Sequence, residues 1–218
     1  MKTHYYLGWF TNFLPEKLSR MLQEDISDRR SLIMISSNPN CYEENGETER
    51  SWLNQAGIMF DDYHVINYRV QKEDAQTLIE NASVIFLLGG DVLKQNGFLK
   101  EYNLSDLIKK SKAVVIGTSA GAINMSAKWL CSPNLGYKVE KSSICEGIGL
   151  NDFSVLSHFD LENNMALIQE ELSPLSKELN IYVSNKDCAL RLKGNKIDIS
   201  GKIYLVSHSQ IHKLEETL

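Results

Sequence analysis

The 218-residue sequence lacks the features that mark several large classes of protein. Its four cysteines, Cys41, Cys131, Cys145 and Cys188, form no CxxC pair, which excludes zinc-ribbon and thioredoxin-type motifs. No apolar run approaches the roughly 20 residues that a bilayer-spanning helix needs. The first apolar stretch is broken early by glycine, asparagine and proline, unlike a secretory signal. We therefore expect a cytoplasmic protein with free thiols and no membrane partner.

Patterns of nucleotide and nucleic-acid binding are also missing. The sequence contains neither GxGxxG nor GxxxxGK[ST]. Its formal net charge is -5, and its basic pairs, Arg29-Arg30 and Lys109-Lys110, are short, whereas phosphate binding needs a concentrated basic face. The acidic stretch 43–49 contains no histidine and so has no metal-ligand pattern. These absences predict no nucleic-acid partner, no cofactor and no metal.

Short apolar segments alternate with helical patterns, which indicates stacked βαβ units. Strands are predicted at 32–37, 64–68, 84–88, 113–116, 152–157, 181–183, 188–192, 196–199 and 203–206. Helices are predicted in the second half of 43–55, at 73–80, at 93–112 with an interruption near Asn103, at 120–129 and at 163–179. Because no linker or repeat divides the chain, residues 1–218 are predicted to form a single α/β domain. We expect a doubly wound, mostly parallel sheet with a hairpin-rich C-terminal end.

Ser119 is the strongest candidate for a catalytic residue. It lies at the centre of Gly117-Thr118-Ser119-Ala120-Gly121, between a predicted strand and a predicted helix. That is the context of a nucleophile elbow, in which small neighbours permit a tight turn. The N-terminus of the following helix offers unpaired N–H groups and a positive dipole end, both of which stabilise an oxyanion. The alternative is a tight turn in which Ser119 only caps the helix.

A second glycine turn, Gly89-Gly90-Asp91, follows the predicted strand 84–88. In a parallel sheet its tip lies beside the tip of the strand that ends at Ile116, and ligands bind outside such carboxyl ends. The open amides of a Gly-Gly pair are suited to complete an oxyanion hole. A phosphate-binding turn or an ordinary β–α turn remains the alternative.

A serine nucleophile needs a base within hydrogen-bond reach. Among the five histidines, His158 follows a predicted strand and is therefore expected at a strand tip. His208 is a competitor because it gives the order Ser…Asp…His of α/β-hydrolases. The other three, His4, His64 and His212, fit structural or exposed positions better. The residues alone leave both His158 and His208 open.

Four segments together resemble the peptidase E family of serine peptidases, the aspartyl dipeptidases, which also includes the cyanophycinases. They are Gly89-Gly90-Asp91, the run from Gly117 to Asn124, 149–159 and 189–204. The resemblance covers most of the chain from about residue 30. It implies a three-layer α/β sandwich related to class I glutamine amidotransferases. It also implies that Ser119 is the nucleophile, His158 the general base, and Gly90 and Ala120 the amide donors to the oxyanion.

The chain departs from this family at the third catalytic position. The family usually has an acid in the turn before a late strand, and the matching stretch here is 184–190. The alignment places Lys186 at the acid's position, with Asp187 next to it. Either Asp187 orients His158 after a shift of one residue, or the orienting acid is missing. A lysine cannot accept the imidazole N–H bond.

A second departure concerns the substrate. Aspartyl dipeptidases need a cation for the substrate's aspartate side chain, and the family places an arginine some way after the histidine. The corresponding stretch 160–167 contains no arginine or lysine and is acidic, so it would repel an aspartate side chain. Arg191 or Lys193 on a neighbouring strand are candidate substitutes, unless both are solvated charges.

The sequence therefore predicts a serine-type exopeptidase that acts on short peptides, with dipeptides bearing N-terminal Asp as one candidate class. Ser119, His158 and Asp187 form the predicted catalytic set, and the protein is expected as a monomer or homodimer. Two other hypotheses stay open. One is an esterase-like hydrolase that uses Ser119 with His208, and the other is a catalytically silent binding protein of the same fold.

Overall fold

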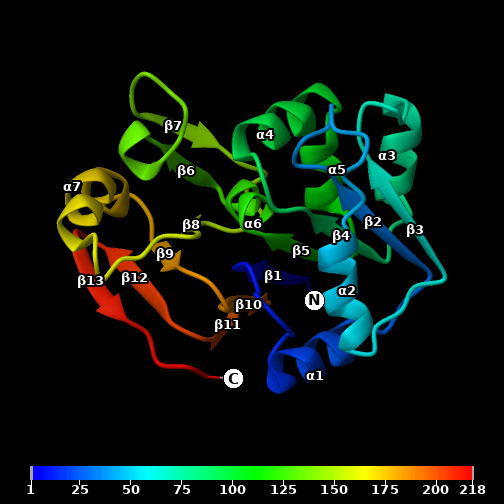
Figure 1. Ribbon diagram of the computed structural model, residues 1–218, viewed down its shortest axis with the longest axis horizontal. Coiled ribbons are helices and arrows are strands. Elements are labelled where there is room, and N and C mark those ends of the chain that lie inside the picture. The colour runs from blue at the N-terminus through cyan, green and yellow to red at the C-terminus, as the bar shows by residue number, and fades with distance from the viewer. Residues whose placement is uncertain (1, 218) are drawn as a thin grey trace.

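The structure is a computed structural model that describes residues 2–217, apart from the side chain of Gln169, and its centre is a seven-stranded sheet with helices on both faces (Figure 1). In spatial order the strands are β11 (Lys196–Ser200), β10 (Ala189–Lys193), β1 (Thr3–Leu7), β5 (Val114–Thr118), β4 (Val84–Leu87), β2 (Ser31–Ile35) and β3 (Asp62–Ile66). Five neighbouring strands, β1, β5, β4, β2 and β3, are parallel to one another. Strand β10 pairs antiparallel with β1, and β11 pairs antiparallel with β10. This arrangement confirms the predicted three-layer, mostly parallel sheet.

The helices form two layers because successive strand residues point to opposite faces of the sheet. One layer consists of α1 (Glu16–Asp25) and α2 (Glu47–Gln55), and the other consists of α3 (Lys72–Glu80), α4 (Val92–Glu101), α5 (Leu104–Lys110) and α6 (Ala120–Met125). On β4, Val84 and Phe86 pack toward the first layer, while Ile85 and Leu87 pack toward the second. All four are fully buried, so both faces of the sheet are covered.

The parallel strands end together and form one rim of the sheet, which we call the carboxyl-end rim. Leu87 of β4 is in register with Gly117 of β5, and Leu7 of β1 is in register with Thr118. Ile35 of β2 pairs with Leu87 on the other side. The predicted adjacency of the two glycine turns is therefore confirmed, because both follow neighbouring strand ends at this rim.

A second sheet and a hairpin lie beside the central sheet, toward α7 (Met165–Ser176) in Figure 1. The second sheet has the order β13 (Gln210–Lys213), β12 (Ile203–Ser207), β9 (Ile181–Ser184) and β8 (Ser154–Leu156). The hairpin pairs β6 (Lys128–Cys131) with β7 (Ser143–Glu146), joined through the short 3-10 helix Pro133–Leu135. Strands β8 and β9 are parallel, so their carboxyl ends also lie side by side.

The predicted helix 120–129 is wrong in its second half. Helix α6 ends at Met125, and Ser126 is extended with φ -61° and ψ 163°. The Ser126 hydroxyl accepts a hydrogen bond of 3.0 Å from the Val155 amide, and the Ala127 amide donates to the Phe153 carbonyl at 3.2 Å. These tertiary contacts pull the chain away from the helix axis. The predicted break near Asn103 is confirmed, since Asn103 separates α4 from α5 with φ 54°.

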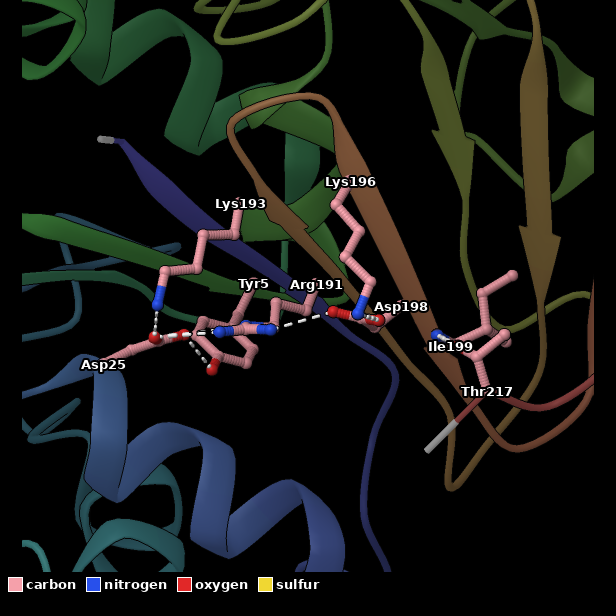
Figure 2. A network of polar contacts seen from close by, with 8 residues as sticks. All are labelled: Tyr5, Asp25, Arg191, Lys193, Lys196, Asp198, Ile199 and Thr217. Carbon is pink, nitrogen blue, oxygen red and sulfur yellow. Dashed lines mark hydrogen bonds and ion pairs between the residues drawn. The ribbon is translucent and has the colours of Figure 1, made fainter.

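A buried ion-pair network ties α1 to the strands at one end of the central sheet (Figure 2). The Arg191 guanidinium donates to both oxygens of Asp25, at 2.7 and 2.9 Å, and to Asp198 at 2.8 Å. Tyr5 and Lys193 also bond Asp25, each at 2.7 Å, and Lys196 pairs with Asp198 at 2.8 Å. We call these six side chains the Asp25 network. Its two carboxylates and its guanidinium are almost completely buried, and each has opposite charge beside it.

Candidate active site

Ser119 occupies a strained turn at the end of β5. Its φ is 49° and its ψ is -107°, outside the regions that a residue with a side chain readily adopts. The Ser119 amide donates to the Leu7 carbonyl at 2.9 Å, and the neighbouring Thr118 hydroxyl donates to the Gly8 carbonyl at 3.0 Å. These two hydrogen bonds to the end of β1 and the residue after it therefore hold Ser119 in this conformation. Strain of 1–3 kcal/mol persists only where surrounding contacts impose it, and it concentrates at functional sites.

The helix after Ser119 packs unusually close to the sheet. A side chain at Gly121 would come within 2.1 Å of the Leu87 carbonyl oxygen, so only glycine fits there. This close approach sets the N-terminus of α6 directly behind the serine. Within the described residues, neither Ala120 N–H nor Gly90 N–H donates a hydrogen bond to the protein. Both predicted oxyanion donors are therefore unengaged.

The Gly89-Gly90 turn lies against Ser119. A side-chain carbon built on Gly89 would lie 3.6 Å from Ser119 Cβ and 3.4 Å from the Trp9 ring. Gly90 has φ 138°, and a side chain there would collide with the Ser37 hydroxyl at 2.2 Å. The two ends of β4 and β5 thus meet as predicted. Asp91, the third residue of that motif, caps α4 by accepting from the Lys94 amide at 3.0 Å.

Two glutamates, Glu44 and Glu49, support this turn from behind, a role that no motif in the sequence indicated. The Ser37 hydroxyl donates at 2.6 Å to the Gly89 carbonyl, and the Glu44 carboxylate accepts from the Ser37 amide at 2.9 Å. Buried Glu49 accepts from the Gly89 amide at 3.2 Å. Burial raises the pKa of Glu49, with a smaller contribution from the nearby Glu44 charge. The acidic stretch 43–49, which has no metal-ligand pattern in the sequence, therefore partly serves as a support for the glycine turn.

A cavity of about 300 Å³ adjoins the same turn. Gly89, Leu88 and Trp9 form its wall toward Ser119, and residues 43–49 form the rest. Four of the seven residues in that stretch are glutamates, so the cavity has an acidic lining. Such a lining favours a cationic group over an anionic one.

His158 follows β8 and lies at the carboxyl end of the second sheet. The Phe159 amide donates to the Ser184 carbonyl at 3.1 Å, which fixes the segment beside the end of β9. Like Ser119, His158 has a positive φ, here 60°. Surrounding protein atoms lower the pKa of its imidazole by desolvation, and the Lys186 ammonium lowers that pKa further. The histidine is thus disposed to be neutral, the form in which it can accept a proton.

The turn after β9 does not bring Asp187 to His158, and the predicted orienting contact is absent from the hydrogen bonds of residues 2–217. Asp187 accepts from the Thr11 amide at 3.0 Å, and its own amide donates to the Trp9 carbonyl at 3.1 Å. The charged group that acts on the imidazole is Lys186. Asp187 therefore fastens the loop after β1, because the backbone at φ 53° turns its carboxylate toward that loop.

Ser119 and His158 are connected through the loop after β1. The Leu7 carbonyl accepts a hydrogen bond from the Ser119 amide, and the Gly8 amide donates one to the Cys188 carbonyl at 2.8 Å. A side chain at Gly8 would lie 2.7 Å from the Asn185 carbonyl oxygen, so this loop packs tightly on the turn after β9. That turn adjoins His158. No hydrogen bond joins the serine hydroxyl to the imidazole within residues 2–217, as is common before substrate binding tightens catalytic contacts.

The competing histidine, His208, lies at the opposite end of the second sheet. It follows β12, whose Val206 pairs with Ile181 at the start of β9, whereas His158 adjoins Ser184 at the end of β9. The His208 amide donates to the Ser176 carbonyl at 2.8 Å, and its ring contacts the Ser207 hydroxyl at 3.0 Å. This placement separates His208 from the carboxyl-end rim and favours His158.

Neither of the two candidate cations for an aspartate substrate is available to the rim. Arg191 and Lys193 belong to the Asp25 network, where both bond the buried Asp25 carboxylate (Figure 2). Both are therefore engaged as partners of Asp25; the Arg191 side chain is buried, whereas that of Lys193 is partly exposed. In the acidic stretch after His158, Glu162 pairs with Lys202 and accepts from the Tyr204 hydroxyl.

Neither a metal-binding cluster nor a membrane-spanning helix is found among the residues that the structure describes. Residues 2–217 contain no group of three or more His, Cys, Asp or Glu side chains arranged to hold a metal ion. None of the described helices combines the length and the apolar character required to cross a bilayer.

Comparison with known proteins places this chain in one family. The profile of peptidase family S51 matches residues 20–200. A cyanophycinase of Geminocystis herdmanii is 29% identical over 143 residues, which are 62% of this chain and 53% of that protein. A cyanophycinase of Trichormus variabilis is 26% identical over 146 residues, 63% of this chain and 49% of that protein. The chain thus spans about half the length of the curated relatives it matches.

Solved structures share the whole fold. A peptidase from an acI-B1 Actinobacterium superposes with a TM-score of 0.69 at 19% identity, covering 99% of this chain and 95% of that one. A putative peptidase E protein of Listeria monocytogenes EGD-e gives a TM-score of 0.67 at 18% identity, covering 92% and 98%. At such low identities, the likeness establishes the architecture alone.

Proposed function

The chain belongs to peptidase family S51, and on that premise we propose that it is a serine-type exopeptidase that hydrolyses short peptides through an acyl-enzyme on Ser119. The observation that carries this proposal is the backbone of Ser119 itself. A non-glycine residue with φ 49° and ψ -107°, between a buried strand and a helix N-terminus, has the strained geometry of a nucleophile elbow. A serine that only capped α6 would need neither that strain nor the unengaged amides around it.

The proposed reaction follows from the groups at the rim. The Ser119 hydroxyl attacks the peptide carbonyl while His158 takes its proton. The amides of Gly90 and Ala120 stabilise the oxyanion, and His158 then gives the proton to the leaving amine. Water hydrolyses the resulting ester by the reverse sequence. Burial and the Lys186 charge lower the pKa of His158, which favours the neutral imidazole that the first step needs.

Short peptides fit the site better than longer chains with blocked ends. The acidic cavity beside Gly89 is suited to the free ammonium group of a peptide N-terminus. The relatives named cyanophycinase agree with peptide hydrolysis in general. Preference for N-terminal Asp has no support in the acidic stretch after His158, and Arg191 and Lys193 are engaged elsewhere.

The test of this function is hydrolysis of a small dipeptide library by wild type and Ser119→Ala. We expect a loss of at least about 10³-fold in kcat, because removing a serine nucleophile leaves only binding and oxyanion contributions. Ser27→Ala is the matched control, since Ser27 is exposed and precedes β2 at the opposite edge of the sheet. Full activity of Ser119→Ala would refute the proposal.

One observation favours a second candidate, a catalytically silent binding protein of the same fold. Lys186 adjoins His158, and Asp187 binds the Thr11 amide, so the imidazole has no carboxylate partner among residues 2–217. Losing the orienting acid of a serine protease lowers kcat by about 10⁴-fold. This candidate predicts dipeptide binding without turnover in the same library, in wild type and Ser119→Ala alike.

A further inference from the structure

The peptide bond between Gly89 and Gly90 contains one of the two proposed oxyanion donors, the Gly90 N–H. Because neither residue has a side chain, the turn itself does little to prevent this peptide from rotating by half a turn. In a planar trans peptide the carbonyl and the N–H point in opposite directions, so such a rotation would place the Gly89 carbonyl where the N–H had been. A carbonyl oxygen there would repel an oxyanion instead of binding it. The orientation of this one peptide therefore has to be fixed by a contact from outside the turn.

The order of the strands places Ser37 and Ser119 on opposite sides of this turn. Strand β4, which leads to Gly89, lies between β5 and β2 in the sheet. Ser119 follows β5, and Ser37 follows β2. The Ser37 hydroxyl donates to the Gly89 carbonyl at 2.6 Å, so that carbonyl points toward the β2 side. The Gly90 N–H consequently points toward the β5 side, where a carbon built on Gly89 would lie 3.6 Å from Ser119 Cβ.

Ser37 is well placed to hold this orientation. Its side chain is buried, and among residues 2–217 no other group donates to the Gly89 carbonyl. The Gly89 amide is engaged as well, by Glu49 at 3.2 Å. Both polar backbone groups of Gly89 are thus bound by the protein, whereas the Gly90 N–H that follows them is unengaged.

Glu44 in turn holds Ser37. One of its carboxylate oxygens accepts from the amides of Ser37 and Asn38, at 2.9 and 3.1 Å, and from the Ser36 hydroxyl. The other carboxylate oxygen lies 2.7 Å from the Ser37 hydroxyl oxygen. A serine hydroxyl has a single proton to donate, so Glu44 and the Gly89 carbonyl compete for it. Whether the Gly89 carbonyl is held therefore depends on which acceptor this proton faces.

We propose that Ser37 is a positioning residue, whose hydroxyl holds the Gly89–Gly90 peptide with its N–H directed toward Ser119, and that Glu44 orients this hydroxyl. The inference rests on the proposed function, because it concerns the oxyanion hole of the same site. The action of Ser37 is indirect, through the Gly90 amide. Since an oxyanion forms only in the transition state, losing the hydroxyl should slow the reaction without weakening substrate binding.

The main test is the second-order rate constant for labelling of Ser119 by a fluorophosphonate, whose phosphoryl oxygen occupies an oxyanion hole. We expect Ser37→Ala to slow labelling by about tenfold to 10²-fold, because the buried Gly89 carbonyl loses its donor and the peptide is free to rotate. For the library peptide that wild type hydrolyses fastest, kcat should fall by the same factor while KM stays within about twofold. An unchanged labelling rate, or an effect on KM alone, would overturn the inference.

The matched control is Ser36→Ala. It removes a neighbouring buried hydroxyl that also donates to Glu44, but within residues 2–217 Ser36 has no hydrogen bond to Gly89. We expect both serine variants to lose a similar amount of stability in urea, while labelling of Ser36→Ala stays within about threefold of wild type. Equal slowing of labelling in the two variants would show a general loosening of the loop after β2 and would contradict the specific role of Ser37.

Two variants of Glu44 test how the hydroxyl is oriented. Glu44→Gln can place an NH₂ group beside the Ser37 hydroxyl and donate to it, which leaves the single serine proton for the Gly89 carbonyl. The remaining side-chain oxygen keeps the other three contacts. Labelling of this variant should therefore be at least as fast as in wild type, whereas Glu44→Ala should slow it about tenfold. Glu44→Gln labelling as slowly as Glu44→Ala would contradict the orienting role.

Labelling and hydrolysis together separate this inference from the proposed function. Slower labelling of Ser37→Ala, without peptide hydrolysis by wild type, refutes the peptidase function and supports the positioning role. Hydrolysis by wild type with an unchanged kcat in Ser37→Ala refutes the positioning role and leaves the peptidase function standing. Absence of both labelling and hydrolysis in wild type would overturn both.

Discussion

Two regions of this molecule concentrate polar side chains around β1, and they handle those groups in opposite ways. In the Asp25 network every buried charge meets an opposite charge, and the contacts join α1 to β10 and β11. At the carboxyl-end rim, Ser119, His158 and Lys186 have no oppositely charged partner among residues 2–217, and the backbone at Ser119 and His158 has positive φ. The comparison indicates that the network serves stability, whereas the rim keeps reactive groups available at a cost in strain.

The distribution of backbone strain supports this contrast. Six non-glycine residues of the described chain have positive φ, and Ser119, His158 and Asp187 are three of them. The Asp25 network contains none of the six. Half of these six residues belong to the catalytic set that the sequence predicted, as expected if their backbone positions are imposed for function. Substitutions in the two regions should therefore separate stability from activity.

The largest expected effect on stability comes from Asp25→Asn. The change leaves the buried Arg191 guanidinium with Asp198 as its one remaining anion, and breaking a buried pair in this way costs about 3–5 kcal/mol. Urea denaturation should show this loss in the free energy of unfolding. Asp28→Asn is the control, because its pair with Arg30 is exposed and should contribute little. Equal stability of both variants would contradict the structural role of the network.

Among changes that keep the catalytic side chains, Gly90→Ala should lower the activity of the rim most. The new side chain meets the Ser37 hydroxyl and requires φ 138°, so the turn must move and carry the Gly90 amide with it. Loss of one oxyanion donor lowers kcat by about 10²–10³-fold. Gly97→Ala provides the matched control, since nothing lies within 4 Å of its new carbon. Unchanged kcat in Gly90→Ala would exclude this amide from the oxyanion hole.

Acid should weaken the Asp25 network. Burial alone would raise the pKa of Asp25, but hydrogen bonds from Arg191, Lys193 and Tyr5 outweigh it and hold that pKa below the usual value. A lowered folded-state pKa contributes stability above the unfolded value of about 3.9, and this contribution is lost as pH falls through the folded value. Urea midpoints measured from pH 6 to pH 2 should fall more steeply for wild type than for Asp25→Asn. Parallel profiles would contradict the assignment.

The smallest effect concerns the pH dependence of catalysis. Desolvation lowers the pKa of His158, and the charge of Lys186 lowers it further. Lys186→Gln removes the second contribution, so the pKa rises and the acid limb of kcat/KM should move to higher pH. Lys186→Arg should leave the limb in place. A limb that stays fixed in Lys186→Gln would show that a group other than His158 is the titrating base.

The sequence predicted the regular part of the fold well because buried parallel strands have continuous apolar runs. Strands β2, β4 and β5 and the break at Asn103 lie close to where the patterns placed them. Strand β1 and helix α1 were missed, since Tyr5-Tyr6-Leu7 was interpreted only as a short apolar stretch. That omission matters, because the loop after β1 connects Ser119 with the turn that presents Lys186. The apolar run followed by Gly8 was the available signal.

At the candidate site, local motifs predicted positions but not partners. The two glycine turns were correctly placed side by side because strand order and register determine the rim. The partner of Asp187 depended on backbone conformation, as φ 53° directs its carboxylate to Thr11. Similarly, Arg191 and Lys193 were separated from the rim by Asp25, a residue 166 positions from Arg191 in sequence. Such long-range pairing leaves no trace in local patterns.

The central claim is that Ser119 is an activated nucleophile at the rim. The most direct measurement is treatment of the native protein with a fluorophosphonate probe, followed by intact-mass analysis and peptide mapping. We expect a single adduct on Ser119 in the wild type, abolished by Ser119→Ala and by His158→Ala and preserved in His208→Ala. No adduct on the folded wild type, or an adduct that persists in Ser119→Ala, would contradict the account.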